Sequence, residues 1–114
     1  MADKALTAGS TPLLVLKLLE EKDMYGYEMI ETLASRSDQT FDLKAGTLYP
    51  LLHDLEKQGA LSSYDDGAGG KRVRRYYSLT EKGRGILAQK AAEWEEFSRG
   101  VNLVLQGGAI HGMA

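Results

Sequence analysis

Cysteine is absent from the 114-residue sequence. The chain therefore has no disulfide framework, no thiolate metal site and no thiol nucleophile. Long apolar runs are absent too, and the N-terminus lacks the basic-then-apolar pattern of a secretion signal. We therefore expect a protein of the reducing cytoplasm that has no membrane partner. Its length fits one domain over residues 1–114.

Residues suited to catalysis are scarce as well. The two histidines, His53 and His111, have no evident partners for acid–base chemistry or metal binding. Gly67, Gly69 and Gly70 lie at a predicted hairpin tip and do not open a helix, so they do not form a nucleotide-binding loop. We expect neither an enzyme nor a resident metal or cofactor.

Net positive charge is also lacking, because the formal net charge is −2. The distribution of charge matters more than its sum. Between Lys71 and Arg84 the sequence has six lysines and arginines and one acid, Glu81, which gives a local excess of five positive charges. A solvated charged hairpin would show the same run. Its place beside a glycine-rich tip favours contact with nucleic acid.

The stretch from Lys44 to Gly59 predicts the helix around which the chain is organised. Its apolar positions recur with the spacing i, i+3, i+4 and i+7 and are Leu48, Leu51, Leu52 and Leu55. The other face presents Thr47, Tyr49, His53 and Asp54. Gly59 is suited to a left-handed cap at the C-terminal end. Pro50 requires a nearby start, between Asp42 and Thr47, or a bend.

Two helices are predicted before this one. Ser10 and Thr11 offer a capping hydroxyl and Pro12 a first helical position, so the first helix should begin there. The residues that follow are almost all apolar, which predicts a helix buried on most of its surface. The second helix should end near Arg36 and turn Tyr27 toward the core. Its glycine, Gly26, indicates close packing or a sharp entry.

Two strands and a long helix complete the prediction. The strands are expected over 61–65 and 72–79, joined by the glycine-rich tip. Thr80 should cap the last helix, which extends from Glu81 to about Gln106. The fold class is therefore mainly α with a small β-hairpin wing (α+β). A winged helix-turn-helix covers residues 10–79, and a C-terminal dimerisation helix covers residues 80–106.

The last helix carries an apolar stripe with coiled-coil spacing. We expect a homodimer interface formed by Leu87, Ala91, Trp94, Phe97, Val101, Val104 and Leu105. No later core element is present to cover this stripe, so the same helix of a second copy is the favoured partner. The stripe could instead pack back on its own domain, and Gly100 weakens a strict coiled coil.

Four sequence blocks resemble the PadR family of bacterial transcriptional regulators. They read YGYE at 25–28, GTLYPLL at 46–52, LEKQG at 55–59 and RYYSLTEKG at 75–83. Each block alone is weak evidence, but the series in this order is specific. The resemblance covers roughly residues 7–105 and is nearest to the short subfamily with a single C-terminal helix.

The resemblance implies a homodimer that binds a pseudo-palindromic operator, usually as a repressor. It also implies release by a small effector, such as a phenolic acid or a planar hydrophobic compound. In some short members a tryptophan at the position of Trp94 stacks on flat ligands, so Trp94 and Phe97 are the predicted effector-binding residues. Trp94 could equally well only fill the dimer seam.

For DNA, we expect the helix at 44–58 to enter the major groove and the hairpin to follow phosphates or an adjacent minor groove. The predicted contact residues are Tyr25, Lys44, Thr47, Tyr49, Lys71, Arg72 and Arg74. The alternative function is a winged-helix module that binds a protein and not DNA.

Overall fold

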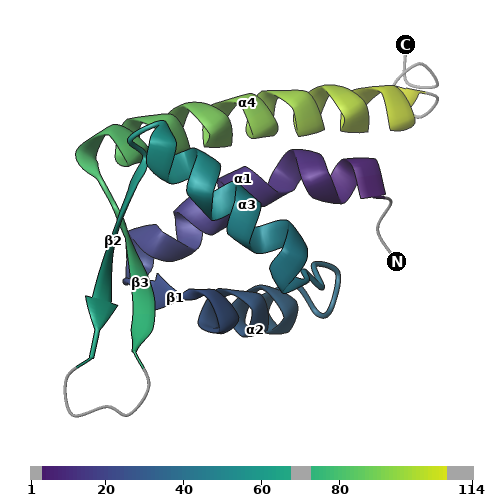
Figure 1. The fold of residues 1–114 in the computed structure, drawn as a ribbon. Helices are drawn as coiled ribbons and strands as arrows, with labels where there is room; N and C mark the ends of the chain where they lie inside the picture. Colours follow the sequence, from purple (N-terminus) through teal and green to yellow (C-terminus); the bar gives the residue numbers. More distant parts are fainter. Residues whose placement is uncertain (1–3, 68–72, 108–114) are drawn as a thin grey trace.

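The computed structural model describes residues 4–67 and 73–107. In these residues the elements, in chain order, are α1 Lys4–Glu21, β1 Met24–Tyr25, α2 Gly26–Arg36, α3 Ala45–Lys57, β2 Leu61–Asp66, β3 Arg74–Leu79 and α4 Glu81–Leu105 (Figure 1). The predicted class, mainly α with a small β wing, is confirmed. Within the described ranges no helix has the length and apolarity needed to cross a bilayer.

Helix α1 begins earlier than predicted. It starts at Lys4, so Pro12 lies inside it. The hydroxyls of Ser10 and Thr11 donate to the carbonyls of Leu6 and Thr7, at 3.0 and 2.6 Å. The two hydroxyls thus bond back to the preceding turn and do not cap a new helix. The rest of α1 is the predicted central core helix.

The core lies where α1 meets α2, α3 and the inner face of the sheet. Its most buried side chains are Val15, Leu16, Leu18, Met29, Leu48 and Leu52. The predicted apolar face of α3 is confirmed, since Leu55 is also buried and Leu51 packs against the cluster.

The prediction that Tyr27 of α2 turns toward the core was wrong. Gly26, Met29 and Leu33 are its buried residues, whereas Tyr27 is 61% exposed. The close packing expected at Gly26 is present, because a Cβ atom there would overlap the phenol of Tyr49. Gly26 therefore faces the core. Tyr27, the next residue, is rotated by about 100° around the helix axis and points to the surface.

The sheet has three antiparallel strands in the order β1-β3-β2, so β3 is central. The two residues of β1 were not predicted, because so short a strand carries no alternation. In the register Tyr76 lies opposite both Tyr25 and Tyr64. Figure 1 shows the β2–β3 hairpin projecting away from the helices as a wing.

The end of α3 and the start of α4 form one joint. Gly59 has φ +82°, and the amides of Gly59 and Ala60 donate to the carbonyls of Glu56 and Leu55, at 3.0 and 2.9 Å. These two bonds form a Schellman cap, as the glycine predicted. Thr80 caps α4 by accepting a bond from the Gly83 amide at 2.9 Å, which confirms the predicted cap.

Candidate nucleic-acid interface

The outward face of α3 is the first part of the candidate interface. Helix α3 begins at Ala45, with Lys44 as its N-cap, inside the predicted interval. Burial of Leu48 and Leu52 turns Lys44 and Thr47 to the surface, where both are exposed. The ion pair of Lys44 with Asp42 is long, at 3.4 Å, and lies in solvent, so the ammonium stays available to another anion.

Tyr49 connects this face to α2. Its side chain is 39% exposed, and its phenol lies against Gly26. Burial, and then the neighbouring Tyr27, raises the pKa of the Tyr49 phenol above its ordinary value. The phenol therefore stays protonated at neutral pH and is a neutral hydrogen-bond donor.

The start of β3, at the tip end of the wing strands, is the second part. The guanidinium of Arg74 lies over the ring of Tyr25, 4.6 Å from the ring centroid. Arg75 instead pairs with Asp65 at 3.4 Å, across the strands. In the part of the chain that the structure describes, Arg74 forms no ion pair. The two neighbouring arginines thus differ in how far their charge is already compensated.

Tyrosines on the outer face of the sheet support Arg74. Tyr25 meets Tyr76 edge-on with centroids 5.4 Å apart, and Tyr76 stacks on Tyr64 at 5.7 Å. The Tyr64 hydroxyl donates to the Asp23 carboxylate at 2.7 Å, and this bond raises the pKa of Tyr64 to about 12. We call Tyr25, Tyr64 and Tyr76 the tyrosine row.

A hollow of about 440 Å³ lies between these two parts. Its lining includes Tyr25, Tyr27, Glu31, Tyr49, Arg74 and Arg75. Four elements contribute to it: β1, the start of α2, the first half of α3 and the start of β3. The hollow thus joins the outward face of α3 to the wing.

The predicted DNA-binding residues fall into two groups. Tyr25, Tyr49 and Arg74 line the hollow, while Lys44 and Thr47 lie on the outward face of α3. Lys71 and Arg72 lie outside the described residues. Sequence reasoning did not assign Tyr64 and Tyr76 to the site. The alternation along β3 puts Tyr76 on the same face as Arg74, opposite the buried Tyr77 and Leu79.

The predicted stripe on α4 divides into two parts. Leu87 is 5% exposed and belongs to the core of its own chain, so its assignment to the dimer interface was wrong. From Ala91 onward the stripe residues Trp94, Phe97, Val101, Val104 and Leu105 are exposed. The rings of Trp94 and Phe97 are neighbours, with centroids 6.1 Å apart.

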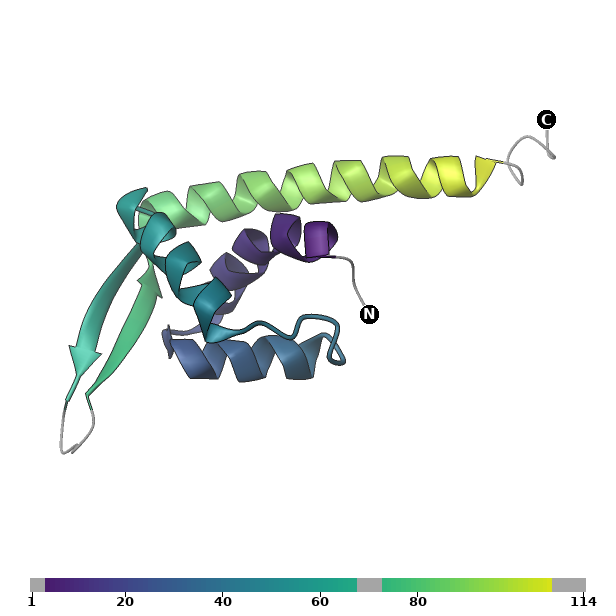
Figure 2. The same cartoon turned by 45° about the vertical axis from the view of Figure 1, so that its right-hand side comes forward.

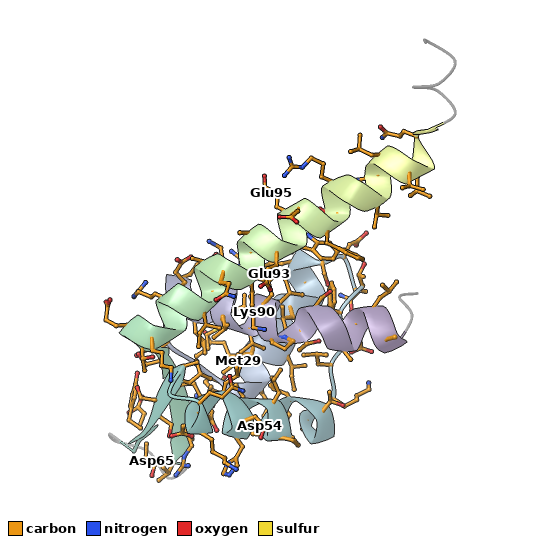
Figure 3. All side chains as sticks on the ribbon, turned by 90° about the horizontal axis from the view of Figure 1, so that it is seen from above. Met29, Asp54, Asp65, Lys90, Glu93 and Glu95 are labelled. Atoms are coloured by element: carbon orange, nitrogen blue, oxygen red, sulfur yellow. The ribbon has the colours of Figure 1, made fainter. Side chains whose placement is uncertain are left out.

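The views of the structure explain this division. Helix α1 runs beside the first part of α4, and in Figure 2 the second part of α4 extends beyond the end of α1. Figure 3 places Lys90 and Glu93 on the side of α4 toward α1, with Glu95 on the other side. Past Trp94 no described element covers the apolar stripe.

Comparison with known proteins gives consistent results. Residues 15–89 match the family model described as the transcriptional regulator PadR-like family. A transcriptional regulator from Clostridium thermocellum has a similar structure, with 31% identity, a TM-score of 0.82, and coverage of 90% of this chain and 96% of that one. A PadR family regulator from Eggerthella lenta has 37% identity and a TM-score of 0.79, over 90% of this chain and 87% of that one. An uncharacterised protein of Lysinibacillus sphaericus is 33% identical over 94% of this chain and 98% of its own.

Proposed function

This chain belongs to the PadR-like family of transcriptional regulators, and we propose that it is a homodimeric repressor that binds a pseudo-palindromic operator and is released by a small planar aromatic or hydrophobic compound. Membership of the family makes it a DNA-binding regulator of transcription and not an enzyme. The proposal includes a cytoplasmic location, where bacterial DNA lies.

The observation that carries the proposal is the exposed start of α3 beside a basic wing. Helix α3 enters the major groove with Lys44 and Thr47 toward the duplex, and the wing follows the neighbouring backbone or minor groove. Lysine and arginine at these places bind phosphates, and the threonine hydroxyl can bond a phosphate or a base edge.

Dimerisation supplies the two-fold symmetry of the operator. The exposed part of the α4 stripe packs against the same stripe of a second copy about a two-fold axis. Phe97 is 60% and Val104 is 80% exposed in the single chain. Burial of each side chain of this size contributes about 1.5–3 kcal/mol, which is the driving force for the pairing.

The effector site is proposed for the same stripe. Trp94 is 49% exposed and its ring lies beside that of Phe97, so the pair offers an aromatic surface to a flat compound. A compound inserted there would change how the two α4 helices pack, and with it the separation of the two α3 helices. This coupling would release the operator.

Selection from a random-sequence duplex library tests the DNA-binding proposal. The wild-type protein should enrich a pseudo-palindrome, and Lys44→Ala and Thr47→Val should weaken binding to it about tenfold each. Lys17→Ala, a surface lysine on α1 paired with Glu20, is the matched control and should bind like the wild type. A dimer that retains no duplex even at low salt would instead favour the protein-interaction module.

Calorimetry tests the effector proposal separately. Titrating p-coumaric acid, a phenolic acid, and acridine, a planar hydrophobic compound, should give binding that is lost in Trp94→Ala while the dimer remains. Because the sequence has one tryptophan, fluorescence quenching is informative in the wild type and in Phe97→Ala. Unchanged binding of both compounds by Trp94→Ala would remove this stripe as the effector site.

A further inference from the structure

The expected path of the DNA backbone passes the hollow beside the start of β3. With α3 in a major groove and the wing at the adjacent minor groove, the strand that separates the two grooves must pass between them. The hollow lies between these elements. Resting on the proposed function, we propose that the hollow holds one backbone phosphate of the operator, bound by Arg74 and by the phenols of Tyr27 and Tyr49.

Arg74 supplies the positive charge, and Tyr25 positions it. The ring face of Tyr25 covers one face of the guanidinium, which leaves the N–H groups free at its edges. Arg74 pairs with no acid among the described residues, although Asp66 lies opposite it in the strand register. An arginine already held in place loses less side-chain entropy when it binds a phosphate.

The tyrosine row gives this arrangement its rigidity. Tyr76 packs against Tyr25 from the neighbouring strand, Tyr64 stacks behind it, and Asp23 holds the Tyr64 hydroxyl. The ring of Tyr25 is therefore held by Tyr76 of β3, which Tyr64 of β2 supports from the other side. Tyr25, predicted from the sequence as a DNA contact, becomes a positioning residue for Arg74.

The phenols and one carboxylate complete the lining. Tyr27 is 61% exposed and Tyr49 is 39% exposed, and both line the hollow. The Tyr49 hydroxyl lies against Gly26 at the edge of the hollow. Both phenols are the donors that we assign to a phosphate oxygen. Glu31 also lines the hollow, and its negative charge opposes a phosphate. Glu31 therefore tests the direction of the effect, because neutralising its carboxylate should strengthen the binding of an anion in the hollow.

The experiment uses full-length protein and the duplex selected by the wild type, with single phosphates replaced by neutral methylphosphonates. In the wild type, a methylphosphonate at one position per half-site, between the major-groove and wing contacts, should weaken binding about tenfold. In Arg74→Ala the same replacement should have no further effect. The slope of log affinity against log salt should also fall by about 0.9 per protomer.

Variants of Tyr25 separate positioning from direct contact. Tyr25→Phe keeps the ring and should retain most of the binding that is lost when the ring is removed. Tyr25→Leu removes the ring and should weaken binding severalfold while the salt slope stays unchanged, because the charge of Arg74 remains. Glu31→Gln should tighten binding. Circular dichroism of each variant confirms that the fold is intact.

Two results would overturn the inference while leaving the proposed function in place. One is a methylphosphonate pattern that Arg74→Ala leaves unchanged. The other is weaker binding by Glu31→Gln, which would indicate that the hollow does not receive an anion. Failure of the wild type to select any duplex would contradict the proposed function itself, so the two failures are distinguishable.

Discussion

The two ends of helix α4 carry the same kind of apolar side chain in different surroundings. At the start, Gly83 is buried beside Ala60 and Leu79, and Leu87 is buried in the core where α4 runs along α1. From Trp94 onward the stripe continues with the same spacing, but Phe97 and Val104 are 60% and 80% exposed. The core of the chain is complete at about the third turn of α4, and the later turns are available to a partner.

This difference shows that a periodic stripe on a helix predicts that it will be buried but does not identify what buries it. Leu87 and Val101 occupy equivalent positions of the repeat, fourteen residues apart in the sequence. One packs inside its own chain, and the other is 40% exposed. The distinction depends on where α1 ends, which the pattern in α4 does not contain.

The largest expected effect comes from truncating the buried end. Leu87→Ala should lower the free energy of unfolding by about 2–5 kcal/mol at every protein concentration, because it leaves a cavity in the core. Val104→Ala should change only the concentration-dependent part of the stability. Urea unfolding at two protein concentrations measures both. Equal, concentration-independent losses would contradict the division of α4.

The joint between α3 and α4 offers a matched pair of glycines. A Cβ atom at Gly83 would overlap the Ala60 carbonyl oxygen, whereas one at Gly85 would meet nothing within 4 Å. Gly83→Ala should therefore destabilise the protein by about 1–3 kcal/mol. Gly85→Ala should stabilise it by up to about 1 kcal/mol through helix propensity. Thermal unfolding of the two variants should shift in opposite directions, and shifts of the same sign would refute the tight joint.

The cap of α4 should contribute less to the free energy of unfolding. The Thr80 hydroxyl accepts a hydrogen bond from the Gly83 amide and donates one to the Gly59 carbonyl at 2.6 Å. Thr80→Ala should cost about 1 kcal/mol, and Thr80→Ser should recover most of it because the hydroxyl remains. If serine and alanine are equally destabilising in urea unfolding, the methyl group and not the cap is responsible.

The smallest effect is expected at the wing, where Tyr64 bonds Asp23 in solvent. The folded-state pKa of Tyr64, about 12, lies above its ordinary value of 10.0. Its contribution is therefore present below pH 10 and lost as the pH rises through 12. Tyr64→Phe should lower the midpoint of thermal unfolding slightly at pH 8, and the difference should shrink above pH 10. If the midpoint difference between the wild type and Tyr64→Phe grows above pH 10, the hydrogen bond to Asp23 does not stabilise the folded state as described.

Much of the fold could be predicted because local chemistry determines it. The leucine spacing of α3, the left-handed Gly59 and the Thr80 cap each have a short-range cause, and the structure contains all three. The start of α1 was missed because serine and threonine before Pro12 resemble a cap. In the helix their hydroxyls bond back to the preceding turn.

The candidate site was predictable only in part, because its geometry depends on contacts between distant elements. The inward turn of Gly26 depends on Tyr49 in another helix, and this contact leaves Tyr27 on the surface. Likewise, the stacking of Arg74 on Tyr25 requires β1 to pair with β3. The sequence identified most of these residues, but it could not show that they line one hollow.

Sedimentation equilibrium of three proteins tests the central claim, that the exposed turns of α4 belong to a second copy. The wild type and Ala92→Glu, a charge placed on α4 away from the stripe, should sediment as dimers at micromolar concentration. Val101→Glu should sediment as a folded monomer, because it places a charge in the stripe. A wild type that remains monomeric, or a Val101→Glu variant that remains dimeric, would contradict the account.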